Sequence, residues 1–66
     1  MKELLIDVYE MIIGNNCIII SIVKKGNKFI VEKCIVSKDN IYLIYSERFN
    51  KLENAKEKYN KLKATL

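Results

Sequence analysis

The sequence of 66 residues contains no histidine and no proline, and it has only two cysteines and two glycines. Without histidine, the commonest general base and the commonest metal ligand are both missing. Cys17 and Cys34 lie 17 positions apart and no Cys-x-x-Cys pair exists, so a structural zinc site would lack ligands. The two glycines form no phosphate-binding loop. These absences predict a protein that is not an enzyme and that binds no metal or cofactor.

The carboxylates do not change this prediction. Four of them alternate with apolar residues in segments expected to be strands, without the loop context that suits a substrate: Asp7, Glu10, Glu32 and Glu47. A pair of acids working as general acid and base is therefore not expected.

The cysteines and the longest apolar stretch bear on the compartment. Two cysteines inside apolar segments are too few for the disulfide framework of a small secreted domain. The stretch 11–23 is interrupted at 14–16 and is shorter than the roughly 20 apolar residues of a spanning helix. It also lacks a small-residue cleavage site. We therefore expect a cytoplasmic protein with free thiols and no membrane segment.

The spacing of the apolar residues changes near Phe49. Before it, four runs rich in Ile and Val are separated by turn-like segments at 14–16, 26–27 and 38–40, as is typical of strands joined by tight turns. After it, apolar residues recur every three or four positions, as on one side of a helix: Leu52, Ala55, Tyr59, Leu62 and Leu66.

This pattern predicts an α+β fold. A single domain over residues 1–66 is expected, in which a four-stranded antiparallel β-meander is followed by one C-terminal helix packed on one face, in the order ββββα. A chain this short is near the lower limit for independent folding, so marginal stability or oligomerisation is expected. The strands are expected at about 4–13, 17–25, 28–37 and 41–48, and the helix at about 51–64.

The clearest turn is Gly26-Asn27, which suits the two central positions of a type II′ hairpin. With that turn, paired residues have numbers that sum to 53, so Ile22 lies opposite Val31. After Phe49, Asn50 is expected to cap the helix.

The other two turns are expected to be three-residue loops. Such loops place Ile13 opposite Cys17 and Ser37 opposite Ile41, with Asn40 in the left-handed conformation. An error of one residue in either loop would exchange the two faces of the strand concerned.

These registers leave one apolar face without a cover, because a single helix can shield only one side of the sheet. The helix is expected to cover the face that carries Ile6, Val8, Ile12, Ile18, Ile20, Ile22, Phe29, Val31, Ile35, Ile41, Leu43 and Tyr45. On the other face, a protein or dimer interface is expected at Tyr9, Met11, Ile19, Val23, Ile30, Tyr42 and Ile44.

The net charge of +4 results from 12 basic and 8 acidic residues, and residues 49–66 alone carry +3. A basic protein of this kind is attracted to nucleic acid, which provides an alternative function. The candidate contacts would be lysines at the expected hairpin tip and on the helix: Lys24, Lys25, Lys28, Lys58 and Lys61. However, the second sheet face carries more acidic than basic groups, whereas a single-strand binder would present basic groups between aromatic residues.

The sequence therefore predicts a small non-enzymatic interaction module, a homodimer that acts by binding another protein as an inhibitor or adaptor. Its Ile/Lys/Asn-rich composition is compatible with a phage or other AT-rich genome. A protein binding single-stranded DNA or RNA, with the lysines above as contacts, is the alternative. A structural subunit of a larger complex is a third hypothesis.

Overall fold

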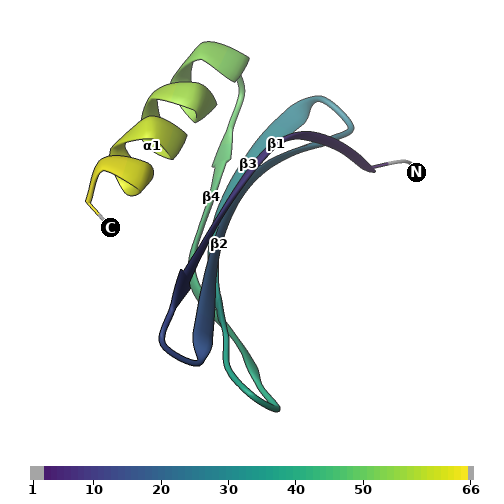
Figure 1. Ribbon diagram of the computed structural model, residues 1–66. Coiled ribbons are helices and arrows are strands. Elements are labelled where there is room, and N and C mark those ends of the chain that lie inside the picture. The colour runs from purple at the N-terminus through teal and green to yellow at the C-terminus, as the bar shows by residue number, and fades with distance from the viewer. Residues whose placement is uncertain (1–2, 66) are drawn as a thin grey trace.

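The computed structural model describes residues 3–65, which form four strands and one helix (Figure 1). All neighbouring strands are antiparallel, and their order in the sheet is the order in the chain. The predicted ββββα fold is confirmed, and each element end lies within one residue of its expected position. The elements are β1 (Glu3–Ile13), β2 (Asn16–Lys25), β3 (Lys28–Val36), β4 (Ile41–Phe49) and α1 (Leu52–Ala64).

The central hairpin of β2 and β3 follows the predicted register along its whole length. Its pairs run without interruption from Cys17 opposite Val36 to Lys25 opposite Lys28. Gly26 has a φ of 63°, as a type II′ turn requires at its first central position. The prediction from Gly26-Asn27 is therefore confirmed.

The turn between β1 and β2 differs from the prediction. Ile13 pairs with Asn16, so the loop contains only Gly14 and Asn15, and Gly14 has a φ of 61°. The expected three-residue loop is wrong because Gly14-Asn15 forms the same kind of two-residue turn as Gly26-Asn27.

This correction exchanges the faces of β1 over most of its length. Tyr9, Met11 and Ile13 lie on the helix face, by which we mean the side of the sheet on which α1 packs. Val8 and Ile12 lie on the open face, the opposite side. Before Asp7 a β-bulge shifts the register, and Ile6 packs against the core on the helix face, as predicted.

The turn between β3 and β4 also differs. The backbones of Ser37 and Asn40 exchange two hydrogen bonds, of 2.8 and 3.2 Å, and Val36 pairs with Ile41. Asn40 does not adopt the left-handed conformation that was expected, since only Gly14 and Gly26 have positive φ among the described residues.

The predicted register is therefore wrong in the first part of β4. Ile41 and Leu43 lie on the open face and Tyr42 on the helix face, the reverse of the prediction. A bulge then inserts Ile44 as an extra residue. From Tyr45 opposite Lys33 onward, the register again agrees with the prediction.

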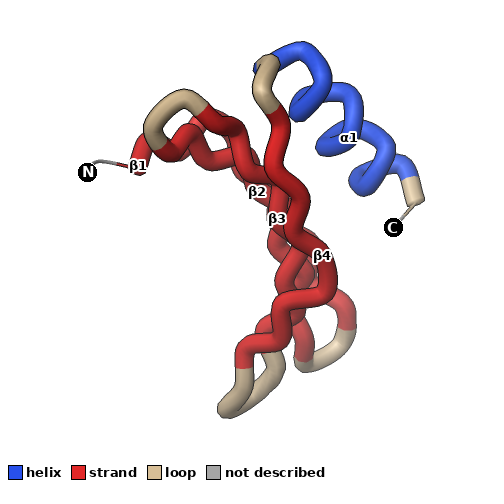
Figure 2. Tube along the Cα trace, turned by 180° about the vertical axis from the view of Figure 1, so that it is seen from behind, coloured by secondary structure: helices blue, strands red, loops and turns tan. Residues whose placement is uncertain are grey.

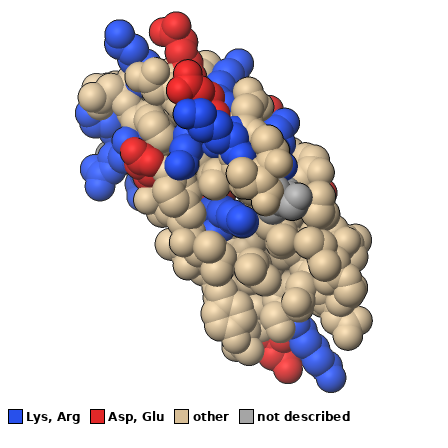
Figure 3. All heavy atoms as spheres, turned by 90° about the vertical axis from the view of Figure 1, so that its left-hand side faces the viewer, with Lys and Arg blue, Asp and Glu red and all other residues tan. Residues whose placement is uncertain are grey.

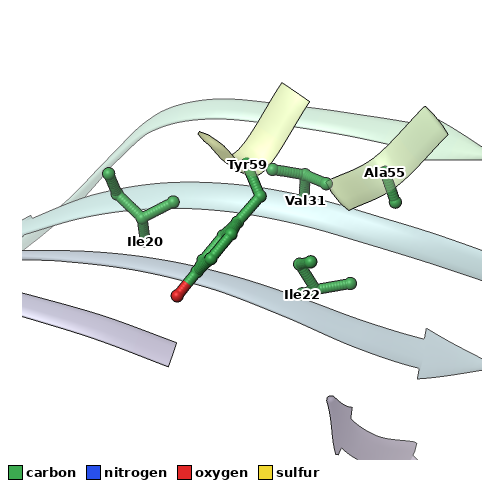
Figure 4. Close-up of a cluster of buried hydrophobic side chains, with 5 residues drawn as sticks. All are labelled: Ile20, Ile22, Val31, Ala55 and Tyr59. Atoms are coloured by element: carbon green, nitrogen blue, oxygen red, sulfur yellow. The ribbon is translucent and has the colours of Figure 1, made fainter. Parts of the chain in front are cut away.

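The core lies between α1 and the middle of the sheet. Ile20, Ile22 and Val31 have no exposed surface and pack under Ala55 and Tyr59 of α1 (Figure 4). These residues are apolar positions of the two central strands and of one side of the helix, so burial follows directly from the two hydrophobic periods.

The helix begins without the expected side-chain cap. Lys51 occupies the N-cap position and makes no side-chain cap hydrogen bond. The prediction that Asn50 caps the helix is wrong, because its side-chain oxygen accepts a hydrogen bond from the Lys28 ammonium instead. This bond joins the tip of the β2–β3 hairpin to the chain entering α1.

The sheet extends well beyond the helix. The molecule measures 36 × 27 × 15 Å, whereas a helix of 13 residues is only about 20 Å long. Both the β1–β2 turn and the β3–β4 turn lie at the end of the sheet that α1 does not reach (Figures 1 and 2). We call this the distal end.

Candidate protein-binding surface

The open face of the distal end is almost entirely apolar. The registers place its side chains in rows that cross all four strands, and we call the first two rows the distal patch. The outer row contains Ile12, Cys17, Val36 and Ile41. The inner row contains Glu10, Ile19, Cys34 and Leu43. Glu10, at the edge of the sheet, is therefore the one charged residue among eight positions.

The outer members of the distal patch are strongly exposed. Ile12 is 80% exposed, Ile41 73% and Leu43 59%, although isoleucine and leucine are among the residues most often buried in folded proteins. The central members, on β2 and β3, are partly buried by their neighbours in the sheet. Scattered single exposures of this kind are normal, but here they are contiguous, and a contiguous apolar patch indicates an interaction site.

A polar row bounds the distal patch on the side toward the helix-covered end. It contains Val8, Ser21, Glu32 and Ser46. The next row, which contains Leu5, Val23, Ile30 and Arg48, is mixed. The open face is thus most apolar at its distal end, farthest from the charged helix.

The charged residues are likewise concentrated away from the distal end. Residues 11–23 and 40–46 contain no charged side chain, and between them at the distal end only Lys38 and Asp39 of the β3–β4 turn are charged. On the helix side of the molecule, Lys, Arg, Asp and Glu gather around α1, and a broad uncharged area lies below it (Figure 3). The distal end therefore offers little electrostatic attraction to a charged ligand.

The two cysteines are part of the distal patch. Both are free thiols and both are partly buried. Burial, together with the negative charge of Glu32, raises the pKa of the Cys34 thiol. A raised pKa disfavours the reactive thiolate at neutral pH, so Cys34 has the properties of a packing residue and not those of a nucleophile.

An open pocket lies between the two distal turns. It has a volume of about 760 Å³ and is lined by Ile13, Gly14, Asn15, Asn16, Ser37 and Lys38. About half of its lining surface is polar and the pocket is wide open, whereas sites for small molecules are mostly apolar and enclose most of the ligand. The pocket fits the rim of a protein contact better than a small-molecule site.

The seven residues predicted for the interface do not lie together. Ile19, Val23 and Ile30 lie on the open face, as predicted. Tyr9, Met11 and Tyr42 lie on the helix face, which corrects their predicted placement. Ile44 is the extra residue of the β4 bulge and has no paired partner. The expected uncovered face exists, but a different set of side chains forms it.

Sequence reasoning missed the three most exposed members of the distal patch, Ile12, Ile41 and Leu43. All three were assigned to the helix face through the two incorrect turns. For Ile12, the signal was present in the sequence, because Gly14-Asn15 repeats the dipeptide of the correctly assigned hairpin. No comparable dipeptide marks the β3–β4 turn.

The lysines proposed as nucleic-acid contacts have partners within the chain. Lys24 lies over the ring of Phe29, at 6.0 Å from its centroid, and Lys58 over Tyr45 at 4.9 Å.

Two further lysines of this set interact with polar side chains. Lys28 donates to Asn50, and the Lys61 ammonium lies 3.7 Å from the Glu57 carboxylate. Lys25 faces Lys28 across the hairpin. Lys25 and Lys28 line one small open pocket together with Arg48, and Lys58 and Lys61 line another that also contains Glu47 and Glu57. The five lysines therefore do not share a single groove.

Within residues 3–65, no group of three or more acidic or cysteine side chains is placed to hold a metal ion. The helix of the described part is too short to cross a membrane. Comparison with protein-family models, curated proteins and solved structures finds no significant match. The function must therefore be inferred from the geometry of the chain itself.

Proposed function

We propose that this protein is a small non-enzymatic interaction module that acts by binding another protein chain through the distal patch. The observation that carries the proposal is the pair of rows in which seven of eight positions are apolar and no described element covers them. Removing such a patch from water contributes about 25 cal/mol for each Å² of apolar surface, and this gain opposes the entropy that two chains lose on association. An inhibitor or adaptor needs no more chemistry than this.

The composition of the distal patch favours a protein over other partners. Nucleic acid is bound mainly by neutralising phosphates, which requires basic groups at the contact. The distal patch has none, and its one charged residue, Glu10, is acidic. A sheet surface with Ile, Val and Leu side chains matches another apolar protein surface, in the way that two sheets pack in a sandwich.

Photo-cross-linking in cells tests the proposal. A photoreactive amino acid replaces Ile41, which is 73% exposed in the distal patch, or Lys61, whose side chain is 69% exposed on α1. We expect a cross-linked adduct with a protein from position 41 and none from position 61. The similar exposure of the two positions makes position 61 a matched control for accidental encounters. If neither position gives an adduct, or if both give the same set, the proposal is wrong.

A further inference from the structure

We infer that the partner of the distal patch is a second copy of this chain, with the distal patches of the two copies packed face to face around a two-fold axis. This inference rests on the proposed function, because it names the partner of the same surface. A two-fold axis lets one patch cover itself. The product is two sheets packed face to face at the overlap, with each helix on the outer side of its own sheet and beyond the overlap.

The accessible surface and the radius of gyration of the chain support the inference that a partner covers part of it. The accessible surface is 4935 Å², whereas a compact monomer of this mass has about 4,300 Å². The radius of gyration is 12.1 Å, against about 10.8 Å for a compact domain of this length. The excess of about 600 Å² is about three quarters of the roughly 800 Å² that each partner contributes to a standard interface. The chain is thus extended by about the amount that one interface would cover.

The structure of the sheet favours contact through its open face over strand pairing at its edges. Both edge strands contain a β-bulge, between Leu5 and Asp7 in β1 and at Ile44 in β4. Bulges interrupt the row of free backbone groups and are one means by which proteins prevent strand addition at an edge. The central pair, β2 and β3, is regular throughout. The open face has no comparable protection.

The charge distribution favours a second copy in this orientation. Residues 49–66 carry a net charge of +3, so two copies repel each other wherever their helices approach. Overlap of the distal patches places these segments on outer layers and leaves an uncharged contact between the copies. Only Glu10, at the edge of the distal patch, needs to remain in contact with water.

Two neighbouring substitutions separate this interface from other modes of association. Leu43→Glu places a charge in the distal patch, and Tyr42→Glu places the same charge next to it on the helix face. The two positions are 59% and 51% exposed, so each substitution is made at a comparable surface position. Circular dichroism establishes that each variant is folded, and light scattering during size-exclusion chromatography measures the mass.

We expect a wild-type mass of twice 7.7 kDa at concentrations above micromolar, the weak end of the affinity range for interfaces of standard size. Leu43→Glu should shift the mass to 7.7 kDa, because a charge without a partner is costly to desolvate. Tyr42→Glu should remain dimeric. A monomeric wild type overturns the inference, as does a dimer that survives Leu43→Glu or that only Tyr42→Glu dissociates.

The natural cysteines provide a second measurement on the unaltered chain, which decides the matter if Leu43→Glu does not fold. Cys17 and Cys34 belong to the distal patch, so dimerisation should slow their reaction with a thiol reagent as protein concentration rises. A rate independent of concentration contradicts the inference.

The outcome also separates this inference from the proposed function. A monomeric chain that still forms a photo-adduct with a different protein at position 41 refutes the second copy and retains the interaction module. A monomeric chain without any adduct refutes both.

Discussion

The two ends of the sheet contain similar side chains and differ in what covers them. At the helix-covered end, Ile20, Ile22 and Val31 have no exposed surface. At the distal end, Ile12 and Ile41 lie on the open face of the two edge strands and are 80% and 73% exposed. The strands continue with the same β-branched composition past the point where the helix ends. Composition alone therefore does not distinguish the folding core from a binding surface in this chain.

The difference in burial between the two ends assigns the stability of the fold to the helix-covered end and binding to the distal end. Full burial of an isoleucine or valine contributes about 1.5 to 3 kcal/mol, and Ile20, Ile22 and Val31, which are fully buried, all lie under α1. The distal patch is available for a partner because the fold obtains its stability elsewhere. Substitutions at the two ends should accordingly differ in their effects.

The largest expected effect is at the helix-covered end. Ile22→Ala leaves a cavity beside Tyr59 and should lower the free energy of unfolding by about 2 to 5 kcal/mol, enough to unfold much of a chain of this size. Ile13→Ala, at a position of the distal end that is 51% exposed, should change it by less than about 0.5 kcal/mol. Urea unfolding followed by circular dichroism measures both. Similar losses in the two variants would remove the distinction between the ends.

The next effect concerns the backbone at the distal end. Gly14 has a φ of 61°, and a Cβ added there would meet no atom within 4 Å. Gly14→Ala should therefore cost about 1 to 2 kcal/mol through the left-handed conformation alone, without a steric clash. Asn15→Ala, at the adjacent position with negative φ, serves as the control and should cost less. Equal unfolding free energies for Gly14→Ala and the wild type would show that the turn adopts another conformation.

A pH dependence should arise at the helix-covered end. Burial raises the pKa of Tyr59, with further contributions from the charge of Asp7 and hydrogen bonding to it. Burial and a hydrogen bond to Glu47 raise the pKa of Tyr45 to about 12, from an ordinary value of 10.0.

Above pH 10.0 the unfolded chain loses these protons while the folded chain keeps them. The corresponding stability is fully present below that pH and is lost as the pH rises through the folded pKa values. The free energy of unfolding should therefore fall between pH 10.0 and about 12. The variant Tyr45→Phe/Tyr59→Phe should show a shallower fall, which separates the tyrosines from the lysines. Equal slopes would contradict this assignment.

The smallest expected signal is the affinity for nucleic acid. Since four of the five candidate lysines already contact Phe29, Asn50, Tyr45 or Glu57, we expect affinity for single-stranded or duplex DNA no tighter than about micromolar at physiological salt. Fluorescence anisotropy over a salt series measures it. A nanomolar complex with sequence preference would make nucleic-acid binding the better description.

The two Gly-Asn turns show how far the sequence determines this fold. The element order, the element ends and the central register followed from hydrophobic period and from Gly26-Asn27. The same dipeptide at Gly14-Asn15 was assigned an additional loop residue, Asn16, and this single residue moved Tyr9, Met11 and Ile12 to the wrong faces. Because side chains alternate along a strand, an error of one residue in a turn assigns the side chains of the adjoining strand to the wrong face.

The bulges could not be predicted in the same way. The inserted Ile44 lies within an uninterrupted apolar run, residues 41–45, and no glycine or polar residue marks its position. The face errors in β1 and β4 lie between the distal turns and the bulges, and they include Tyr9, which packs against the core on the helix face. The location of the helix-covered core was therefore predictable, and the composition of the distal patch was not.

The most direct test of the central claim uses the isoleucines, which occur at both ends and on both faces. Methyl NMR spectra of isoleucine-labelled protein are recorded over a dilution series. We expect concentration-dependent shifts for Ile12, Ile19 and Ile41 in the distal patch, and constant shifts for Ile20 and Ile22 beneath α1. Constant shifts for all five, or changes confined to the helix face, would contradict the pairing of two copies through the distal patch.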